Sequence, residues 1–343
     1  MLYLIGKKDN PQLSLMASAA RKNGVDYTKI DTDDPQFSVS ISPEELLING
    51  LRPESKSVFF LSGVYYQFPF LPEEKAFTDW TYFQDFHLSQ QQLKSQLYSL
   101  LYILSCKKDE YTLVNDFIPS INLTSRYEVL LKLKDGGFRV PKVCLSNSLL
   151  KVQEMHKSLG GVLWSYPDSN SPIREITYGK LDDLFNGGHS SIPYLLYEPV
   201  RGNVLRISFF EDRPILVNII SPPERKAFNE ELEKFTYCIP EGELEETGRK
   251  LYKEFGTGFY EVFGILDDEG TFWFYDISFD PNISYMDQDA QNYAASRLLE
   301  LMLKKGGIEK KIPCKEVLQG KRNTVFLKRM LVHLFEIQQN QEL

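Results

Sequence analysis

The sequence predicts an α/β plus α+β protein, in which a small open α/β sheet precedes a two-lobed α+β region. Short apolar runs alternate with helical patterns over the first 61 residues, and a second alternation of strands and helices begins at Val140. The chain of 343 residues also exceeds what one hydrophobic core usually organises. We therefore predict three segments, at residues 1–115, 116–192 and 193–343.

The first segment reads as an open sheet with helices packed on it. Apolar residues recur at helical spacing from Leu13 to Ala20, and Gly24 ends that pattern. A leucine-rich helix at Gln90–Leu104 has one apolar face and is expected to pack on the same sheet. The predicted strands are Leu2–Ile5, Val25–Ile30, Phe37–Ile41 and Ser57–Leu61.

Strands and helices also alternate in the second region, which predicts two α+β lobes. Runs rich in β-branched and aromatic residues mark its strands, and apolar residues at helical spacing mark its helices. The predicted strands are Val162–Ser165, Pro193–Val200, Leu205–Phe210, Pro214–Ile220, Tyr260–Leu266 and Thr271–Ile277. The predicted helices are Ser125–Lys134, Ser148–Leu159, Asn229–Phe235, Glu243–Phe255, Asp289–Lys304 and Val325–Gln338.

Composition argues against several classes of protein. A net charge of -8 argues against a nucleic-acid binder, which needs a basic face to neutralise phosphates. No apolar run reaches the roughly 18 residues that cross a membrane, and no signal-peptide pattern follows Met1. Four widely spaced cysteines predict reduced thiols rather than a zinc site or a disulfide framework. We expect a cytoplasmic protein with a small-molecule or peptide partner and without nucleic acid or membrane; a homodimer stays open.

The stretch Gly258–Asn282 carries the clearest chemical signal. Its two strand candidates flank the acidic turn Asp267-Asp268-Glu269-Gly270, and the second strand ends in Asp276, Ser278 and Asp280. Hard cations such as Mg²⁺ prefer oxygen ligands, commonly one or two carboxylates supplemented by the phosphates of a nucleotide. The same residues also suit a solvated turn. Two interpretations therefore stay open, a metal site and a plain surface turn.

Several motifs, taken in order, resemble the ATP-grasp superfamily, in which two α+β lobes clamp a nucleotide beneath a small α/β domain. Arg126 stands where the family has a nucleotide-contacting lysine. Tyr197-Glu198-Pro199-Val200 resembles the hinge strand, and Gly202-Asn203-Val204-Leu205-Arg206 resembles the G-x-x-x-R turn and strand that follow it. Asp276–Pro281 stands where the family's metal hairpin ends in E-x-N-P-x-P. The resemblance covers almost the whole chain and implies an ATP-grasp fold.

The resemblance also implies a role for each matched residue. Arg126 would hold phosphate, Val200 would hold adenine through its backbone, and Glu198 would meet the ribose. Arg206, as the catalytic residue, would contact phosphate or the acyl-phosphate intermediate. The implied cofactors are ATP and Mg²⁺, and the implied metal ligands are Asp276 together with Asp267, Ser278 or Asp280.

Three positions depart from the family pattern. A second lysine normally ends the family's strand that matches 162–167, where this chain has Trp164, Ser165 and Tyr166. The resemblance implies that Tyr166 or a neighbour would take the lysine's place beside the nucleotide. The loop at 168–172 has no glycine to let the backbone approach a phosphate. Ser278 replaces an asparagine, and a hydroxyl is a weaker metal ligand. These departures leave catalytic competence open.

Two functions are compatible with this pattern. The first is an ATP-dependent carboxylate–amine or carboxylate–hydroxyl ligase that acts through an acyl phosphate on a peptide or amino-acid-like substrate, as in the glutamate ligases and microviridin-type ligases that the chain resembles. The alternative is an ATP-grasp pseudo-enzyme that binds a nucleotide or a peptide. A third option, docking through the basic stretch between Lys304 and Arg329, competes with a simple solvated face.

Overall fold

The computed structural model divides the described chain into two compact units. Described residues from 1–116 and 282–313 form unit 1, and those from 125–281 form unit 2. The chain therefore returns to unit 1 after unit 2. The predicted three-segment division stays a prediction. The described residues are 1–42, 45–63, 80–116, 125–165, 173–175, 185, 188–220, 235–240 and 244–313.

Unit 1 is built on a fully parallel four-stranded sheet. Its strands are β1 (Leu2–Gly6), β2 (Tyr27–Asp31), β5 (Ser57–Leu61) and β6 (Tyr111–Val114), in the order β2-β1-β5-β6. The central strands are buried on both faces, as parallel sheets require, so that Leu4 and Phe59 have no exposed area. A separate antiparallel hairpin is formed by β3 (Val39–Ile41) and β4 (Leu46–Ile48).

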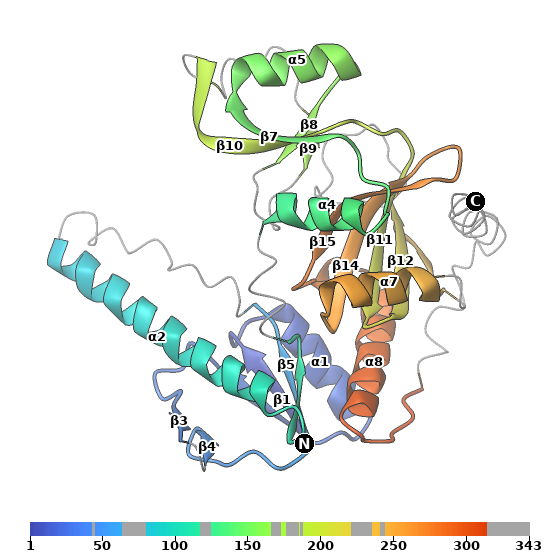
Figure 1. The fold of residues 1–343 in the computed structure, drawn as a ribbon. Helices are drawn as coiled ribbons and strands as arrows, with labels where there is room; N and C mark the ends of the chain where they lie inside the picture. The colour runs from blue at the N-terminus through green and yellow to red at the C-terminus, as the bar shows by residue number, and fades with distance from the viewer. Residues whose placement is uncertain are drawn as a thin grey trace. The chain divides into compact units, whose positions relative to one another are not determined.

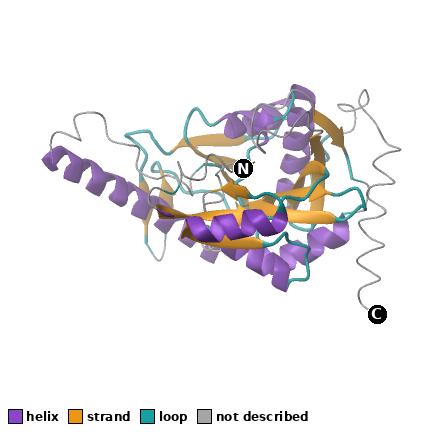
Figure 2. Cartoon of the chain, turned by 90° about the horizontal axis from the view of Figure 1, so that it is seen from above, coloured by secondary structure: helices purple, strands orange, loops and turns teal. Residues whose placement is uncertain are grey.

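Three helices accompany this sheet: α1 (Pro11–Lys22), α2 (Trp80–Cys106) and α8 (Gln288–Lys305). Asn10 starts α1 by accepting a hydrogen bond from the Leu13 N–H at 3.1 Å, and Asp287 starts α8 by accepting from the Ala290 N–H at 3.0 Å. The helices α1 and α8 pack against each other although they lie far apart in the sequence. In both views, α2 extends past the sheet as a long helix (Figures 1 and 2).

Unit 2 contains a small antiparallel sheet with the order β7-β10-β8-β9. Its strands are β7 (Val143–Ser148), β8 (Leu163–Ser165), β9 (Arg174–Glu175) and β10 (His189–Tyr197), and α5 (Leu149–Leu159) covers one face of it (Figure 1). Val152 of α5 packs with Phe185, Tyr194 and Leu196 in a small core of its own.

A larger antiparallel sheet completes unit 2. It consists of β13 (Phe235–Cys238), β12 (Arg213–Ile220), β11 (Asn203–Phe210), β14 (Phe259–Leu266) and β15 (Phe272–Ser278), in that spatial order, with α4 (Arg126–Asp135) and α7 (Glu245–Phe255). Side chains alternate along β11, so that Leu205 and Ile207 enter the main apolar core while Arg206 and Ser208 point to the other face. That second face carries the candidate site.

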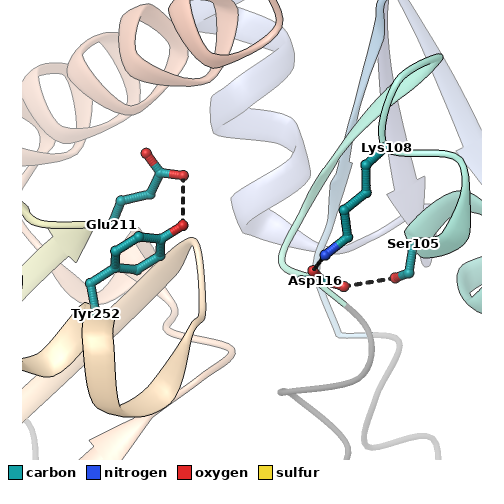
Figure 3. Close-up of polar contacts among 5 residues, drawn as sticks. All are labelled: Ser105, Lys108, Asp116, Glu211 and Tyr252. Atoms are coloured by element: carbon teal, nitrogen blue, oxygen red, sulfur yellow. Dashed lines mark hydrogen bonds and ion pairs between the residues drawn. The ribbon is translucent and has the colours of Figure 1, made fainter.

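Side-chain hydrogen bonds and an ion pair hold one chain connection in place in each unit (Figure 3). In unit 1, the Asp116 carboxylate accepts a hydrogen bond from Ser105 Oγ at 2.8 Å and pairs with Lys108 Nζ at 2.7 Å, which ties the end of α2 to the residues after β6. In unit 2, Tyr252 of α7 donates to the Glu211 carboxylate at 3.3 Å. Glu211 has a left-handed φ of 54° in the turn between β11 and β12, and this contact braces that turn.

Most predicted elements are confirmed, including the open first sheet and the hairpin of β14 and β15. Helix α2 begins at Trp80 rather than Gln90, and the strands β4, β6, β7, β9 and β13 were not predicted. The predicted helix Asn229–Phe235 lies outside the described residues apart from Phe235, which begins a strand instead. The predicted helix Val325–Gln338 also lies outside them. No described helix is both long and apolar enough to span a membrane, and Cys106 and Cys144 are free thiols.

Candidate functional site

A row of paired residues crosses the middle of the large sheet. The strand register pairs Arg206 with both Asn218 and Phe263, and it pairs Phe263 with Asp276. Directly paired residues in antiparallel strands point to the same face, so these four side chains share one face. Two strand spacings separate Arg206 from Asp276, which places their backbones about 10 Å apart. We name these four residues the sheet row.

Asp276 forms a buried ion pair with Arg126, the first residue of α4. Nη2 of Arg126 lies 2.7 Å from Oδ2 of Asp276, and the two side chains are only 3% and 5% exposed. Helix α4 packs directly against β15, which brings the two charges together (Figure 1). Burial alone would lower the pKa of Arg126, but the Asp276 carboxylate and the Tyr197 hydroxyl raise it above its ordinary value. Arg126 therefore stays charged inside the protein, balanced by Asp276.

Tyr197, the last residue of β10, closes this cluster. Its side chain is fully buried, and its hydroxyl bonds with Arg126 and lies 3.3 Å from Ser165 Oγ at the end of β8. Burial raises the pKa of Tyr197 above its ordinary value; Arg126 opposes the rise and Asp276 adds to it. The cluster therefore contains one ion pair and two neutral hydroxyls.

Arg206 lies in the sheet row but pairs with a different carboxylate. Its guanidinium carbon lies 4.1 Å from the Phe263 ring centroid, and its Nη1 lies 3.8 Å from Oε2 of Glu261. Ser208 Oγ donates to the same Glu261 carboxylate at 3.3 Å. A planar guanidinium stacked on a ring and facing a carboxylate has a defined orientation. The charge of Arg206 is thus oriented and balanced within the sheet.

Gly202 lies just before the strand that carries Arg206, and its backbone suits glycine alone. Its φ is +150°, and a Cβ at this position would lie 2.0 Å from the Leu266 carbonyl oxygen at the end of β14. Glycine therefore lets the start of β11 approach the neighbouring strand closely. The close approach of the two strands therefore explains why the G-x-x-x-R pattern of this chain begins with a glycine.

The hinge, defined as residues 198–200, makes four hydrogen bonds within unit 2, and in one of them the Glu198 N–H donates to the Lys142 carbonyl at 2.9 Å. The Glu198 carboxylate accepts from the Lys142 N–H at 3.2 Å. The Tyr275 hydroxyl donates to the Glu198 carbonyl at 2.7 Å and accepts from the Val200 N–H at 3.0 Å. The hinge groups expected to meet ribose and adenine therefore already have partners in the chain.

Asp267 holds the hairpin turn together. One of its carboxylate oxygens accepts from the N–H groups of Glu269 and Thr271, at 3.0 and 2.7 Å, and the other accepts from Trp273 Nε1 at 2.8 Å. Asp267 lies in the turn before β15, whereas Asp276 lies near the far end of that strand. Within the described ranges, no group of three or more His, Cys, Asp or Glu residues is arranged to hold a metal ion.

The structure thus brings some predicted site residues together and separates others. Arg126, Arg206 and Asp276 gather around one face of the large sheet, whereas Asp267 serves the turn. Asp280 and Ser278 follow Asp276 along the chain, and Ser278 pairs in register with Glu261. Tyr166 lies outside the described residues.

Sequence reasoning missed Glu261 and Tyr275. Glu261 left a signal, because a lone carboxylate inside an apolar strand pattern requires a buried partner. Tyr275 left none, because it is one aromatic residue among several in its strand. Its role appears only when β15 lies beside the hinge.

No protein-family model matches this sequence, and no curated protein matches it. Several solved structures, in contrast, are similar to this chain. The ATP-grasp ligase PsnB, complexed with a minimal precursor, Mg and ADP, superposes with a TM-score of 0.73 at 15% identity, over 89% of this chain and 98% of PsnB. The macrocyclase MdnC from Microcystis aeruginosa MRC, bound with precursor peptide MdnA, gives 0.64 at 14% identity, over 89% and 100%.

A third similar structure is a RiPP-associated ATP-grasp ligase from Chryseobacterium gregarium, in complex with ADP and a leader and core peptide. It superposes with a TM-score of 0.63 at 12% identity, over 89% of this chain and 96% of that one. The chain therefore has the ATP-grasp fold, and its structure is similar over most of its length to an ATP-grasp ligase complexed with a minimal precursor, to a RiPP-associated ligase with a leader and core peptide, and to a macrocyclase with a precursor peptide.

A magnesium nucleotide makes three demands, which Asp276, Arg126 and the hinge do not meet as they are arranged. The metal needs carboxylate oxygens, but Asp276 neutralises Arg126. The phosphates need a cation, but Arg126 is held by the same ion pair. Adenine needs a backbone donor and acceptor, but both are bonded to Tyr275. The arrangement does not fit this ligand unless the ion pair and the Tyr275 contacts separate.

Proposed function

We propose that this chain is a peptide-binding protein with the ATP-grasp fold, in which the chain's own side chains close the nucleotide position. The observation that carries the proposal is the buried ion pair of Arg126 and Asp276, because it joins the residue expected to hold phosphate to the residue expected to hold Mg²⁺. Support for a peptide partner comes from the similar ligases, which were solved with precursor peptides.

The energetic cost of opening this pair favours the closed arrangement. Leaving one charge of a buried pair without its partner costs about 3–5 kcal/mol, and each 1.4 kcal/mol is a tenfold change in affinity. A nucleotide would have to offset this cost through new contacts. The chain lacks the second lysine and the glycine-rich loop that would supply such contacts in the family it resembles.

A second candidate function is an ATP-dependent carboxylate–amine or carboxylate–hydroxyl ligase. The observation in its favour is that Arg126, Arg206 and Asp276 share one face of the large sheet, where a phosphate and a Mg²⁺ ion could be held together if the ion pair opened. ATP would supply activation of a substrate carboxylate. This chain's residues would contribute only orientation and charge balance.

Calorimetric titration of the unmodified protein with ADP and Mg²⁺ tests closure of the nucleotide position. We expect a Kd weaker than about 1 mM, corresponding to less than about 4 kcal/mol of binding free energy. A Kd near 1 μM, together with ATP consumption on addition of a peptide, would instead establish the ligase.

A displayed library of random short peptides tests the peptide partner. We expect selected sequences, resynthesised and titrated by calorimetry, to bind with Kd values near the micromolar range, about 8 kcal/mol. The double variant Arg126→Met, Asp276→Leu is the matched control, since it removes both charges together. It should retain peptide binding, and failure to select any binding peptide contradicts the proposal.

A further inference from the structure

The hinge presents a hydrogen-bond acceptor and a donor side by side. The Glu198 carbonyl and the Val200 N–H both reach the same point, because one hydroxyl, that of Tyr275, bonds to the two of them at 2.7 and 3.0 Å. A tyrosine hydroxyl can donate one hydrogen bond and accept another at the same time. Tyr275 therefore satisfies both backbone groups with a single atom.

The same pair of backbone groups matches the edge of an amino-substituted heteroaromatic ring. A heteroaromatic ring with an exocyclic amino group next to a ring nitrogen offers a donor beside an acceptor, as adenine does. Such an edge would donate to the Glu198 carbonyl and accept from the Val200 N–H. The Tyr275 hydroxyl makes the two contacts that this edge would make.

The shape of β15 aims Tyr275 at the hinge. The register pairs Phe263 with Asp276 and the next residue, Gly264, with Phe274, so Tyr275 is the extra residue of a β-bulge. A bulge re-aims the side chain that it carries. The Tyr275 ring is fully buried, and it stacks on Tyr197 with ring centroids 5.6 Å apart and planes at 27°. Both the backbone and a stacked neighbour hold the ring in this position.

We propose that Tyr275 is the residue that determines ligand acceptance at the hinge, excluding adenine-type heteroaromatic rings by occupying their hydrogen-bonding position. This inference rests on the proposed closure of the nucleotide position and deepens it. The Arg126–Asp276 pair closes the charged part of that position, and Tyr275 closes the uncharged part. The two closures involve different atoms and can be tested separately.

Adenosine is the probe that tests the closure by Tyr275 separately from the closure by the Arg126–Asp276 pair, since adenosine carries no phosphate and recruits no metal. Its binding is measured by calorimetry on the wild-type protein, on Tyr275→Val and on Tyr275→Phe. We expect wild type to bind adenosine too weakly to be detected. Tyr275→Val should bind it at least about tenfold more tightly than the weakest affinity that the titration can detect, because two backbone hydrogen-bonding groups and a ring-sized space become available. Tyr275→Phe keeps the ring and should remain closed to adenosine.

Tyr260→Phe is the matched control, because Tyr260 is also a buried tyrosine of the large sheet and its hydroxyl donates to the Glu211 carbonyl at 2.9 Å. It should leave adenosine binding at the wild-type level. Equal affinity of wild type and folded Tyr275→Val for adenosine would overturn the inference. Micromolar binding of ADP with Mg²⁺ to wild type would overturn the proposed function, whatever the Tyr275 variants do with adenosine.

Hydrogen exchange provides a second readout if Tyr275→Val does not fold. In Tyr275→Phe, the Val200 N–H loses its hydroxyl partner, so its exchange rate should rise by about tenfold or more. Amides in the middle of β11 should keep their wild-type rates. An unchanged Val200 rate in this variant would also overturn the inference.

Discussion

The two ends of the β14–β15 hairpin use an aspartate in opposite ways. At the turn, Asp267 accepts hydrogen bonds from three donors that all lie within six residues of it. Further along β15, Asp276 pairs with Arg126, which lies 150 residues earlier in the chain. A carboxylate in a turn is satisfied locally, whereas a carboxylate in a buried strand needs a partner from another element. The two aspartates of one hairpin therefore differ in how far they depend on the rest of the fold.

The largest effect that tests this comparison is expected for Asp276→Ala. The substitution leaves Arg126 buried without its carboxylate, so the free energy of unfolding should fall by about 3–5 kcal/mol, measured by urea denaturation followed by circular dichroism. The double variant Arg126→Met, Asp276→Leu should recover most of the loss, since it leaves no unpaired charge. Wild-type stability of the single variant would show that the pair contributes nothing.

An intermediate effect is expected for Tyr197→Phe, which removes the hydroxyl beside the same ion pair. The free energy of unfolding should fall by about 1–2 kcal/mol at neutral pH. Since burial raises the pKa of Tyr197, its neutral form stabilises the fold below about pH 10, and this contribution is lost as the pH rises further. Unfolding experiments from pH 8 to pH 12 should therefore show a shallower alkaline loss in the variant.

The control for that pH series is Tyr27→Phe, a tyrosine of β2 that is only partly buried. It should follow the wild-type curve. If Tyr197→Phe follows that curve as well, the hydroxyl of Tyr197 does not contribute to the alkaline loss of stability.

A smaller effect is expected for Asp267→Ala, whose free energy of unfolding should fall by about 1 kcal/mol. The carboxylate is partly exposed, so water can replace some of the hydrogen bonds that it accepts. Amide exchange at Glu269 and Thr271 should become faster while exchange in the middle of β15 does not change. The exposed neighbour Asp268 serves as control, and Asp268→Ala should change stability by less than about 0.5 kcal/mol. A loss as large as that of Asp276→Ala would remove the contrast between the two ends of the hairpin.

The smallest effect concerns an ion pair on the surface of the same helix that carries Arg126. Glu128 and Lys132 are one helical turn apart, with 3.0 Å between their charged atoms and side chains that are 46% and 39% exposed. Glu128→Ala should lower stability by less than about 0.5 kcal/mol, and the difference should shrink in 1 M salt. A salt-independent loss above about 1 kcal/mol would contradict this view of exposed pairs.

Much of the fold could be predicted because its signals are local. The apolar run at Ser57–Leu61 predicted β5, and the two aromatic runs around an acidic turn predicted β14 and β15. The short strand β6 was missed because four residues carry little periodicity. The packing of α8 with α1 could not be predicted, because no local pattern tells which unit a late helix joins.

For the candidate site, the sequence by itself determined which residue types stand at which positions. It placed Arg126, Arg206 and Asp276 at spacings that resemble one family, and it showed the absence of the second lysine. Only the tertiary structure decided which atoms those side chains contact. It paired Arg126 with Asp276 and turned Tyr275 onto the hinge, because strand register and a bulge fix which atoms meet across the sheet. Register depends on the packing of the whole sheet, and the residue order within one strand does not contain it.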